Sequence, residues 1–136
     1  MDGNRITTRY TKKYFSHPES AYKIQRRIID ELKIGSFIFP NTMHGILADC
    51  AGEDDTVYEH TDPKWYPPRE TLHCNLMLQK SISGGIPIIE GKEIYLNEKD
   101  LLCYYVSKVK HSSSKVIGNK LRLLYTFGFC INYKKL

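Results

Sequence analysis

A histidine and an aspartate, His60 and Asp62, stand two residues apart in the stretch VYEHTDPKW. The run before them contains β-branched and aromatic residues and a proline follows, so we expect a strand that ends here. Successive side chains of a strand point to opposite faces, which predicts Tyr58, His60 and Asp62 on one face. An imidazole nitrogen and a carboxylate oxygen aimed at one point are two ligands of a metal site.

A third ligand would complete such a site. Two histidines and one carboxylate form the facial triad that holds Fe(II) and leaves coordination positions open. His111 is the best third ligand, because it lies just past the apolar run DLLCYYV, where a returning strand can bring it back. Taken alone, the pair of His60 and Asp62 is more typical of a hydrogen-bonded strand end than of a metal site.

A basic residue stands among apolar neighbours in the last β-prone run, NKLRLLYTFGF. Alternation places Arg122 on one face together with Leu124 and Thr126. A buried arginine is costly without an anionic partner, and its planar guanidinium suits a bidentate contact with a carboxylate. Arg122 is therefore either the anchor of an acid inside a pocket or the partner of a surface carboxylate.

The elements that position these residues begin with one helix. The sequence SHPE indicates a helix start, with Ser16 as the N-cap, and the pattern predicts an amphipathic helix over about residues 17–33. Its apolar face consists of Ala21, Ile24, Ile28 and Leu32.

Short β-prone runs separated by turn residues follow the helix. They are SFIF, GILADC, TVYEH, TLHCNLML, IPII, EIYL, DLLCYYV and LRLLYTFGFCI. Strands of this length and spacing predict a mainly β protein, either a β-sandwich or a barrel of the jelly-roll kind, with the helix packed on the sheet. The polar first 15 residues would form an edge strand or an arm.

The bulk composition limits the classes of protein. A chain of 136 residues has room for one hydrophobic core, so we expect a single domain over residues 1–136, with its β core at about 36–133. The net charge of +5 comes from basic residues spread along the chain, and no nucleic-acid partner is expected. The four cysteines form no CxxC pair, which favours free buried thiols and a cytoplasmic location. No apolar stretch long enough for a membrane span or a signal peptide is found, so no membrane partner is expected.

The order and spacing of these features resemble those of the Fe(II)- and 2-oxoglutarate-dependent dioxygenases, in particular the prolyl-hydroxylase-like branch of that superfamily. The resemblance covers roughly residues 43–131 and rests on HTD, SGGIPII, KDLLCYYV, His111 and Arg122. It implies a double-stranded β-helix, a form of jelly roll. It also implies His60, Asp62 and His111 as iron ligands, Arg122 as the partner of the distal carboxylate of 2-oxoglutarate, and O2 as oxidant.

The resemblance also extends to other pocket residues. It places His73, Asn75 and Met77 inward, although relatives often have a tyrosine that donates to the co-substrate at the position of Met77. Cys50 likewise stands where relatives can have such a tyrosine, and Asn75 or Tyr104 would replace that contact. The candidate co-substrate residues are Arg122, Asn75, Met77 and Tyr104, and the candidate substrate residues are Tyr58, His73, Cys50 and Trp65, the last in the loop DPKWYPPRE.

The function implied by the resemblance is an oxygenase that hydroxylates an unactivated C–H bond and releases succinate and CO2. An intact Asp62 favours hydroxylation, or another oxidation such as desaturation, over halogenation, because halogenating relatives have a small residue there. An amino acid or related small metabolite is preferred as substrate, with a peptidyl, prolyl-type substrate as the alternative. The short chain is also compatible with a homodimer.

Two other functions remain open. A cupin-like metal enzyme would keep the metal ligands without 2-oxoglutarate, and Arg122 argues against it because such an enzyme needs no buried carboxylate anchor. In a non-catalytic jelly-roll binding module, His60, Asp62 and His111 would be separate polar residues.

Overall fold

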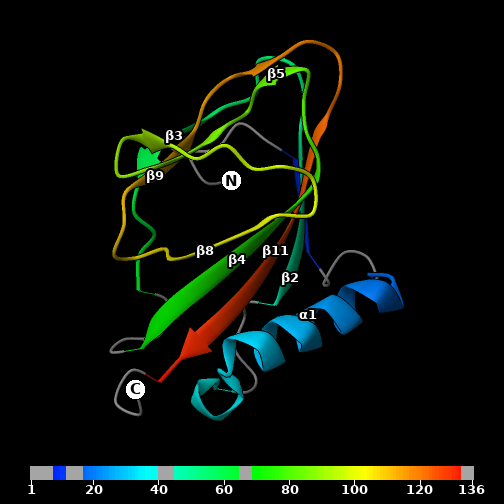
Figure 1. The fold of residues 1–136 in the computed structure, drawn as a ribbon. Helices are drawn as coiled ribbons and strands as arrows, with labels where there is room; N and C mark the ends of the chain where they lie inside the picture. The colour runs from blue at the N-terminus through cyan, green and yellow to red at the C-terminus, as the bar shows by residue number, and fades with distance from the viewer. Residues whose placement is uncertain (1–7, 12–16, 40–44, 65–68, 133–136) are drawn as a thin grey trace.

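The main layer of the protein is an antiparallel sheet of five strands in the order β1-β2-β11-β4-β8, with the helix α1 along one face (Figure 1). The computed structural model describes residues 8–11, 17–39, 45–64 and 69–132. The elements of this layer are β1 Thr8–Thr11, β2 Ile46–Ala51, β4 Glu70–Gln79, β8 Leu101–Tyr105, β11 Arg122–Ile131 and α1 Glu19–Leu32.

A smaller antiparallel sheet faces the main sheet on the side away from α1, in the order β3-β9-β6-β7. Its strands are β3 Val57–His60, β9 His111–Ser113, β6 Pro87–Ile89 and β7 Lys92–Glu93. A two-stranded ribbon of β5 Ser83–Gly84 and β10 Val116–Ile117 lies at one end of the molecule, at the top of Figure 1. Two facing antiparallel sheets with one helix outside confirm the predicted mainly β, jelly-roll architecture.

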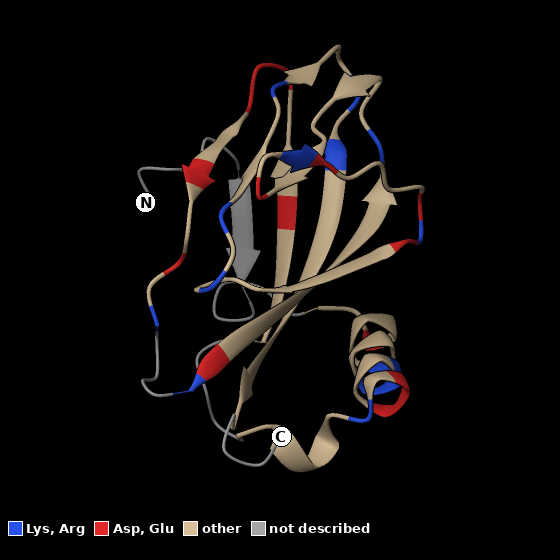
Figure 2. Cartoon of the chain, turned by 60° about the vertical axis from the view of Figure 1, so that its left-hand side comes forward, with Lys and Arg blue, Asp and Glu red and all other residues tan. Residues whose placement is uncertain are grey.

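Charged residues lie mainly in the loops and on α1, although charged segments also occur within inner strands of the main sheet (Figure 2). Among the described residues, no helix is both long enough and apolar enough to span a bilayer.

The strand β11 contributes to two parts of the structure, because one of its faces belongs to the hydrophobic core and the other lines the pocket. On the face toward α1, Phe127, Phe129 and Ile131 form the core with Ala21 and Ile28 of the helix. On the opposite face, alternate residues of β11 line the space between the two sheets. The strand β11 therefore contributes to both the core and the pocket.

The helix agrees with its predicted centre more closely than with its predicted ends. It begins at Glu19 with Pro18 as the N-cap and ends at Leu32, after which Lys33 adopts a left-handed conformation with φ of 55°. Ser16, predicted as the N-cap, lies outside the described residues. Leu32 was predicted on the apolar face but is 42% exposed, because it is the last helical residue and lies beyond the sheet cluster.

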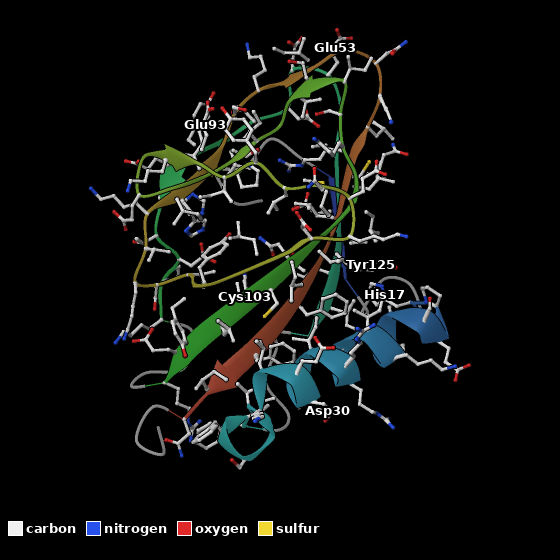
Figure 3. All side chains as sticks on the ribbon, viewed as in Figure 1. His17, Asp30, Glu53, Glu93, Cys103 and Tyr125 are labelled. Atoms are coloured by element: carbon white, nitrogen blue, oxygen red, sulfur yellow. The ribbon has the colours of Figure 1, made fainter. Side chains whose placement is uncertain are left out.

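Aromatic contacts fix the start of the helix on the main sheet. The ring of His17, just before α1, lies edge-on to Tyr125 of β11, with 5.5 Å between centroids (Figure 3). His17 is buried although its side chain is polar. Edge-to-face ring pairs of this kind stabilise a structure beyond the effect of the area that they bury.

Three segments differ from the predicted strands. SFIF contains the end of a 3₁₀ turn, Gly35–Phe37, followed by a single β-bridge from Ile38 to Ile131. Only the first residue of EIYL belongs to a strand, as part of β7. The serine-rich segment after the apolar run DLLCYYV is not among the predicted strands, but it contains β9 and β10, and β9 pairs with β3 on one side and with β6 on the other. Pairing on both sides outweighs the weak β preference of serine.

The predicted N-terminal edge strand is present as β1, which pairs with β2. All four cysteines are free; Cys74 and Cys130 are buried, whereas Cys50 and Cys103 are only half-buried. Cys74 and Cys103 are direct partners in the register of β4 and β8.

Replacing Phe127 tests the importance of the β11 core. Phe127 is fully buried, so Phe127→Ala should lower the free energy of unfolding by about 3–5 kcal/mol through lost apolar contact and an unfilled cavity. Urea unfolding followed by circular dichroism measures this difference. Ile117→Ala is the matched control, since Ile117 is exposed and its loss should change stability by no more than about 0.5 kcal/mol.

A buried carboxylate holds the start of β4 to its neighbours. Glu70 is 3% exposed; its carboxylate pairs with Lys64 Nζ at 2.8 Å and accepts a hydrogen bond from Ser107 Oγ. Burial is the largest single influence and raises the pKa of Glu70, but the contacts with Lys64 and Ser107 and the charge of Lys108 together outweigh it. The net result is a pKa below the ordinary value of 4.5.

This lowered pKa predicts an acid dependence of stability. The contribution of Glu70 is complete above about pH 4.5, the ordinary pKa, and is lost as the pH falls through the lower pKa of the folded state. Glu70→Gln should therefore lower stability at pH 7 and should show a smaller loss between pH 5 and pH 3 than the unmodified protein. Equal acid slopes for the two proteins in urea titrations at stepped pH would show that Glu70 has no such role.

Candidate metal centre

The pairing of β3 with β9 brings the three predicted ligands together. His60, the last residue of β3, is the direct register partner of His111, the first residue of β9. Asp62 follows two residues after His60, and its backbone N–H donates to the carbonyl of Val106 at 2.8 Å. One ligand atom from each of the three side chains lies within 4.8 Å of the others. The three side chains thus converge on a single point.

The backbone fixes which nitrogen of each ring faces that point. His60 Nδ1 lies 2.7 Å from the carbonyl oxygen of Tyr58, and His111 Nδ1 lies 2.9 Å from that of Val109. Because a carbonyl can only accept, each ring carries a proton on Nδ1 and is left with Nε2 for a ligand. Both Nε2 atoms face Asp62 Oδ1, at 3.1 Å for His60 and 3.2 Å for His111.

Two imidazole nitrogens, each oriented by a hydrogen bond from its other nitrogen, and one carboxylate oxygen match the donor set of a divalent iron site. The residues therefore fit the metal that the sequence implies.

The electrostatics keep Asp62 in the form that binds a metal. Burial is the largest influence and raises the pKa of its carboxyl group. The hydrogen bond with His111 and the charges of His73, His111 and His60 act in the opposite direction and together outweigh burial, so the pKa of Asp62 is below its ordinary value. The carboxylate is ionised at neutral pH, as a metal ligand must be.

A β-bulge changes the alternation expected for the first strand. The register of β3 and β9 shifts between Val57 and His60, so that both of these residues face inward. Tyr58, predicted on the ligand face, is instead 56% exposed and does not line the pocket. The extra residue in β3 lets His60 meet His111 while Val57 still closes the pocket.

A pocket between the two sheets connects the metal ligands to Arg122. Arg122 is 3% exposed, and its Nη1 donates to the carbonyl oxygen of Gly85 at 3.0 Å and to Ser113 Oγ. Ser113 follows His111 by two residues and faces the same way, so the arginine is held directly to the ligand strand. Leu124 and Thr126 line the pocket beside Arg122, as the alternation of the last strand predicted.

Other predicted residues are divided between the pocket and its surroundings. His73, Asn75 and Tyr104 line the pocket; Asn75 Nδ2 donates to Tyr104 Oη at 3.3 Å, and the Tyr104 ring lies 5.1 Å from that of His111. Met77 packs against Leu96 and Leu124 and lines a neighbouring cavity of about 200 Å³ that also touches Arg122.

Cys50, a predicted substrate residue, does not line the pocket. Cys50 pairs with Leu123, whereas Asp49 pairs with Leu124 and is the β2 residue that lines the pocket. The side chain that β2 contributes to the pocket is thus that of Asp49, whereas the neighbouring Cys50 is on the opposite face of the strand. Trp65 lies outside the described residues.

Sequence reasoning did not identify Ser113 or Asp49 as pocket residues, nor Gly85 as a partner of Arg122. A signal existed for Ser113, because it is two residues after a ligand and two residues along a strand share a face. For Gly85 the signal was weak, since its contact with Arg122 uses only a backbone carbonyl.

Comparison with known proteins gives a fold relationship. No protein-family model matches the chain, and no curated protein sequence matches it. A prolyl-4-hydroxylase from Pseudomonas putida superposes with a TM-score of 0.68 at 13% sequence identity, covering 96% of this chain and 74% of that one. The chain has the fold of the prolyl hydroxylases.

A second structure supports the same assignment. The viral collagen prolyl hydroxylase of Paramecium Bursaria Chlorella virus-1, solved as a complex with 2-oxoglutarate, superposes with a TM-score of 0.67 at 12% identity, over 94% of this chain and 80% of that one. The resemblance to the prolyl-hydroxylase-like branch is therefore confirmed for the fold, and the double-stranded β-helix with it.

The ligand cluster predicts metal-dependent stability. Under anaerobic conditions Mn(II) at about 100 times its dissociation constant should stabilise the folded protein by about 2.7 kcal/mol. His60→Ala and His111→Ala should lose this increase when thermal unfolding is measured with and without metal. Glu59→Ala, a change to an exposed carboxylate on the same strand, is the control and should keep it. The same increase in all four proteins would place the metal elsewhere.

Proposed function

We propose that this protein is an Fe(II)- and 2-oxoglutarate-dependent oxygenase that hydroxylates a C–H bond. The observation that supports this most is the link from the ligand strand to Arg122 through Ser113. Ser113 and His111 are two residues apart on β9, a rise of about 7 Å. That spacing suits an extended five-carbon diacid, with its oxo-acid end at the metal ligands and its distal carboxylate at the arginine.

The residues around the pocket would bind the iron, bind the co-substrate and exclude water. His60, Asp62 and His111 would hold the iron, and Arg122 would pair with the distal carboxylate of the co-substrate. The chemistry that iron supplies when bound is the O2-dependent decarboxylation of the oxo acid to succinate and CO2, coupled to oxidation of the C–H bond. Val57 and Leu124 line the pocket with apolar surface and would limit the access of water.

The pocket offers further hydrogen-bonding groups for the co-substrate. Asn75 and Tyr104 lie between the main sheet and the metal ligands and are already linked to each other. Either can donate to a carboxylate placed between His111 and Arg122. This supports the proposed replacement for the tyrosine that relatives have at the position of Met77.

Two substrate classes follow from different observations. The pocket between the two sheets is compatible with an amino acid or related small metabolite, the class preferred from the sequence. The names of the two similar structures, a prolyl-4-hydroxylase and a collagen prolyl hydroxylase, support a peptidyl proline equally well. A panel of free amino acids and proline-rich peptides, with succinate release as the readout, distinguishes the two classes.

A cupin-like enzyme without 2-oxoglutarate has less support. Arg122 is buried and in contact with the ligand strand, which is the arrangement needed to bind the distal carboxylate of a 2-oxo acid beside the metal. Nothing in a cupin-like reaction requires that arrangement.

Absorption spectroscopy tests the proposal. Anaerobic addition of Fe(II) and 2-oxoglutarate should produce the metal-to-ligand charge-transfer band of a chelated oxo acid, and admission of O2 should yield succinate. His60→Ala and Asp62→Ala should abolish both signals. Arg122→Ala should keep its metal affinity but need on the order of 10- to 100-fold more 2-oxoglutarate, because charged hydrogen bonds are lost. Arg122→Lys should recover part of that loss.

Two results would contradict the proposal. Absence of the band and of succinate in the unmodified protein would remove the function and leave only the fold. An equal loss of iron affinity in the His60, Asp62 and Arg122 variants would contradict their separate roles.

A further inference from the structure

Besides Arg122, one more buried charged residue lines the pocket: Asp49, which has no role in the proposed reaction. Asp49 of β2 is 3% exposed and lines the same pocket as Asp62 and Arg122. Figure 2 shows charged segments of opposite sign on inner strands of the main sheet. A carboxylate here is unexpected, because the pocket is proposed to hold a dianionic acid.

The register places Asp49 at the arginine end of the pocket. Asp49 is opposite Leu124 on β11, and Arg122 is opposite Ala51, which is two residues further along β2. Asp49 and Arg122 are thus diagonal neighbours on one face of adjacent strands, about 7–8 Å apart at the backbone and within reach of each other's long side chains. On its other side, Asp49 is the register partner of Arg9 in β1.

The titration of a nearby thiol agrees with this placement. Burial is the main cause that raises the pKa of Cys50, the charges of Asp49 and Asp55 raise it further, and the charge of Arg122 lowers it. Together with the register on β11, these charges place Asp49 at the arginine end of the pocket.

A fixed negative charge at this end acts against any ligand with a carboxylate there. At the effective dielectric constant of a protein interior, two like charges some 5–8 Å apart change an affinity on the order of ten-fold or more. This effect does not depend on the charges of the surrounding residues, because removal of the Asp49 carboxylate makes the pocket more positive in every case. A primary amide at the same place has no charge; its oxygen can accept from Arg122 and its NH2 group can donate to a carboxylate.

We propose that Asp49 determines the acid selectivity of the co-substrate pocket. It weakens binding of a 2-oxo acid whose far end is a carboxylate relative to a 2-oxo acid whose far end is an uncharged hydrogen-bond donor, such as a primary amide, and so reduces the preference for 2-oxoglutarate. Arg122 still provides the anchoring contact in both cases. The inference rests on the proposed function, since it concerns the 2-oxo acid that would bind there.

Binding measured without turnover tests this selectivity. The protein is loaded with Mn(II) under anaerobic conditions, and calorimetry gives dissociation constants for 2-oxoglutarate, for its far-end amide 2-oxoglutaramate and for 2-oxopentanoate, which has no far-end polar group. Asp49→Asn should bind 2-oxoglutarate about ten-fold more tightly, bind the amide no more tightly and bind 2-oxopentanoate as before. Glu53→Gln, which removes an exposed carboxylate just beyond β2 (Figure 3), is the control and should leave all three constants unchanged.

The outcomes separate this inference from the proposed function. If the preference between 2-oxoglutarate and its amide is the same in the Asp49→Asn variant, the selectivity role is wrong while the proposed function stands. Weaker binding of 2-oxoglutarate in that variant also overturns it, because Asp49 would then position Arg122. Mn(II) binding without affinity for any 2-oxo acid in either protein overturns both.

The unmodified protein provides a test that does not depend on the folding of the variant. We expect its dissociation constants for 2-oxoglutarate and the amide to lie within about ten-fold of each other, since Asp49 offsets the advantage of a second carboxylate at Arg122. A preference for 2-oxoglutarate above a thousand-fold would overturn the inference.

Discussion

The candidate site depends on one pairing, that of β3 with β9, which sets His60 directly opposite His111. Each ring is then oriented by a hydrogen bond from its Nδ1 to the backbone carbonyl two residues earlier in the sequence. That carbonyl belongs to Tyr58 for His60 and to Val109 for His111. The same local hydrogen bond thus occurs twice and presents two Nε2 atoms to Asp62. Tertiary pairing supplies the proximity of the ligands, and local backbone geometry supplies their direction.

The main sheet supports the metal ligands and contributes Arg122, the charged residue at the other end of the pocket. One face of β11 packs Phe127 and its neighbours against α1, and the other face directs Arg122 into the pocket. Ser113 then joins the arginine to the ligand strand. A disturbance of the helix or of the sheet core would therefore reach the pocket through β11 and its neighbours β2 and β4, even though α1 itself lies on the far face of the sheet (Figure 1).

The sequence was sufficient where a residue's role depends on its type and local period. The apolar face of the helix centre, the strands on either side of the pocket and the inward direction of Arg122 follow from periodicity, and the residues His60, Asp62 and His111 follow from ligand chemistry. Prediction from the sequence failed where tertiary contacts determine the conformation or the direction of a side chain. The bulge in β3 turned Tyr58 outward, the double pairing of β9 made a strand of a serine-rich segment, and a one-residue difference in register put Asp49 in the pocket in place of Cys50.

A crystal structure of the anaerobic protein with Mn(II) and 2-oxoglutarate is the most direct test of the central claim. Anomalous scattering should place the metal on Nε2 of His60, Nε2 of His111 and a carboxylate oxygen of Asp62, and the distal carboxylate of the acid should contact Arg122. Metal bound away from these three side chains, or an acid bound with no contact to Arg122, would contradict the account.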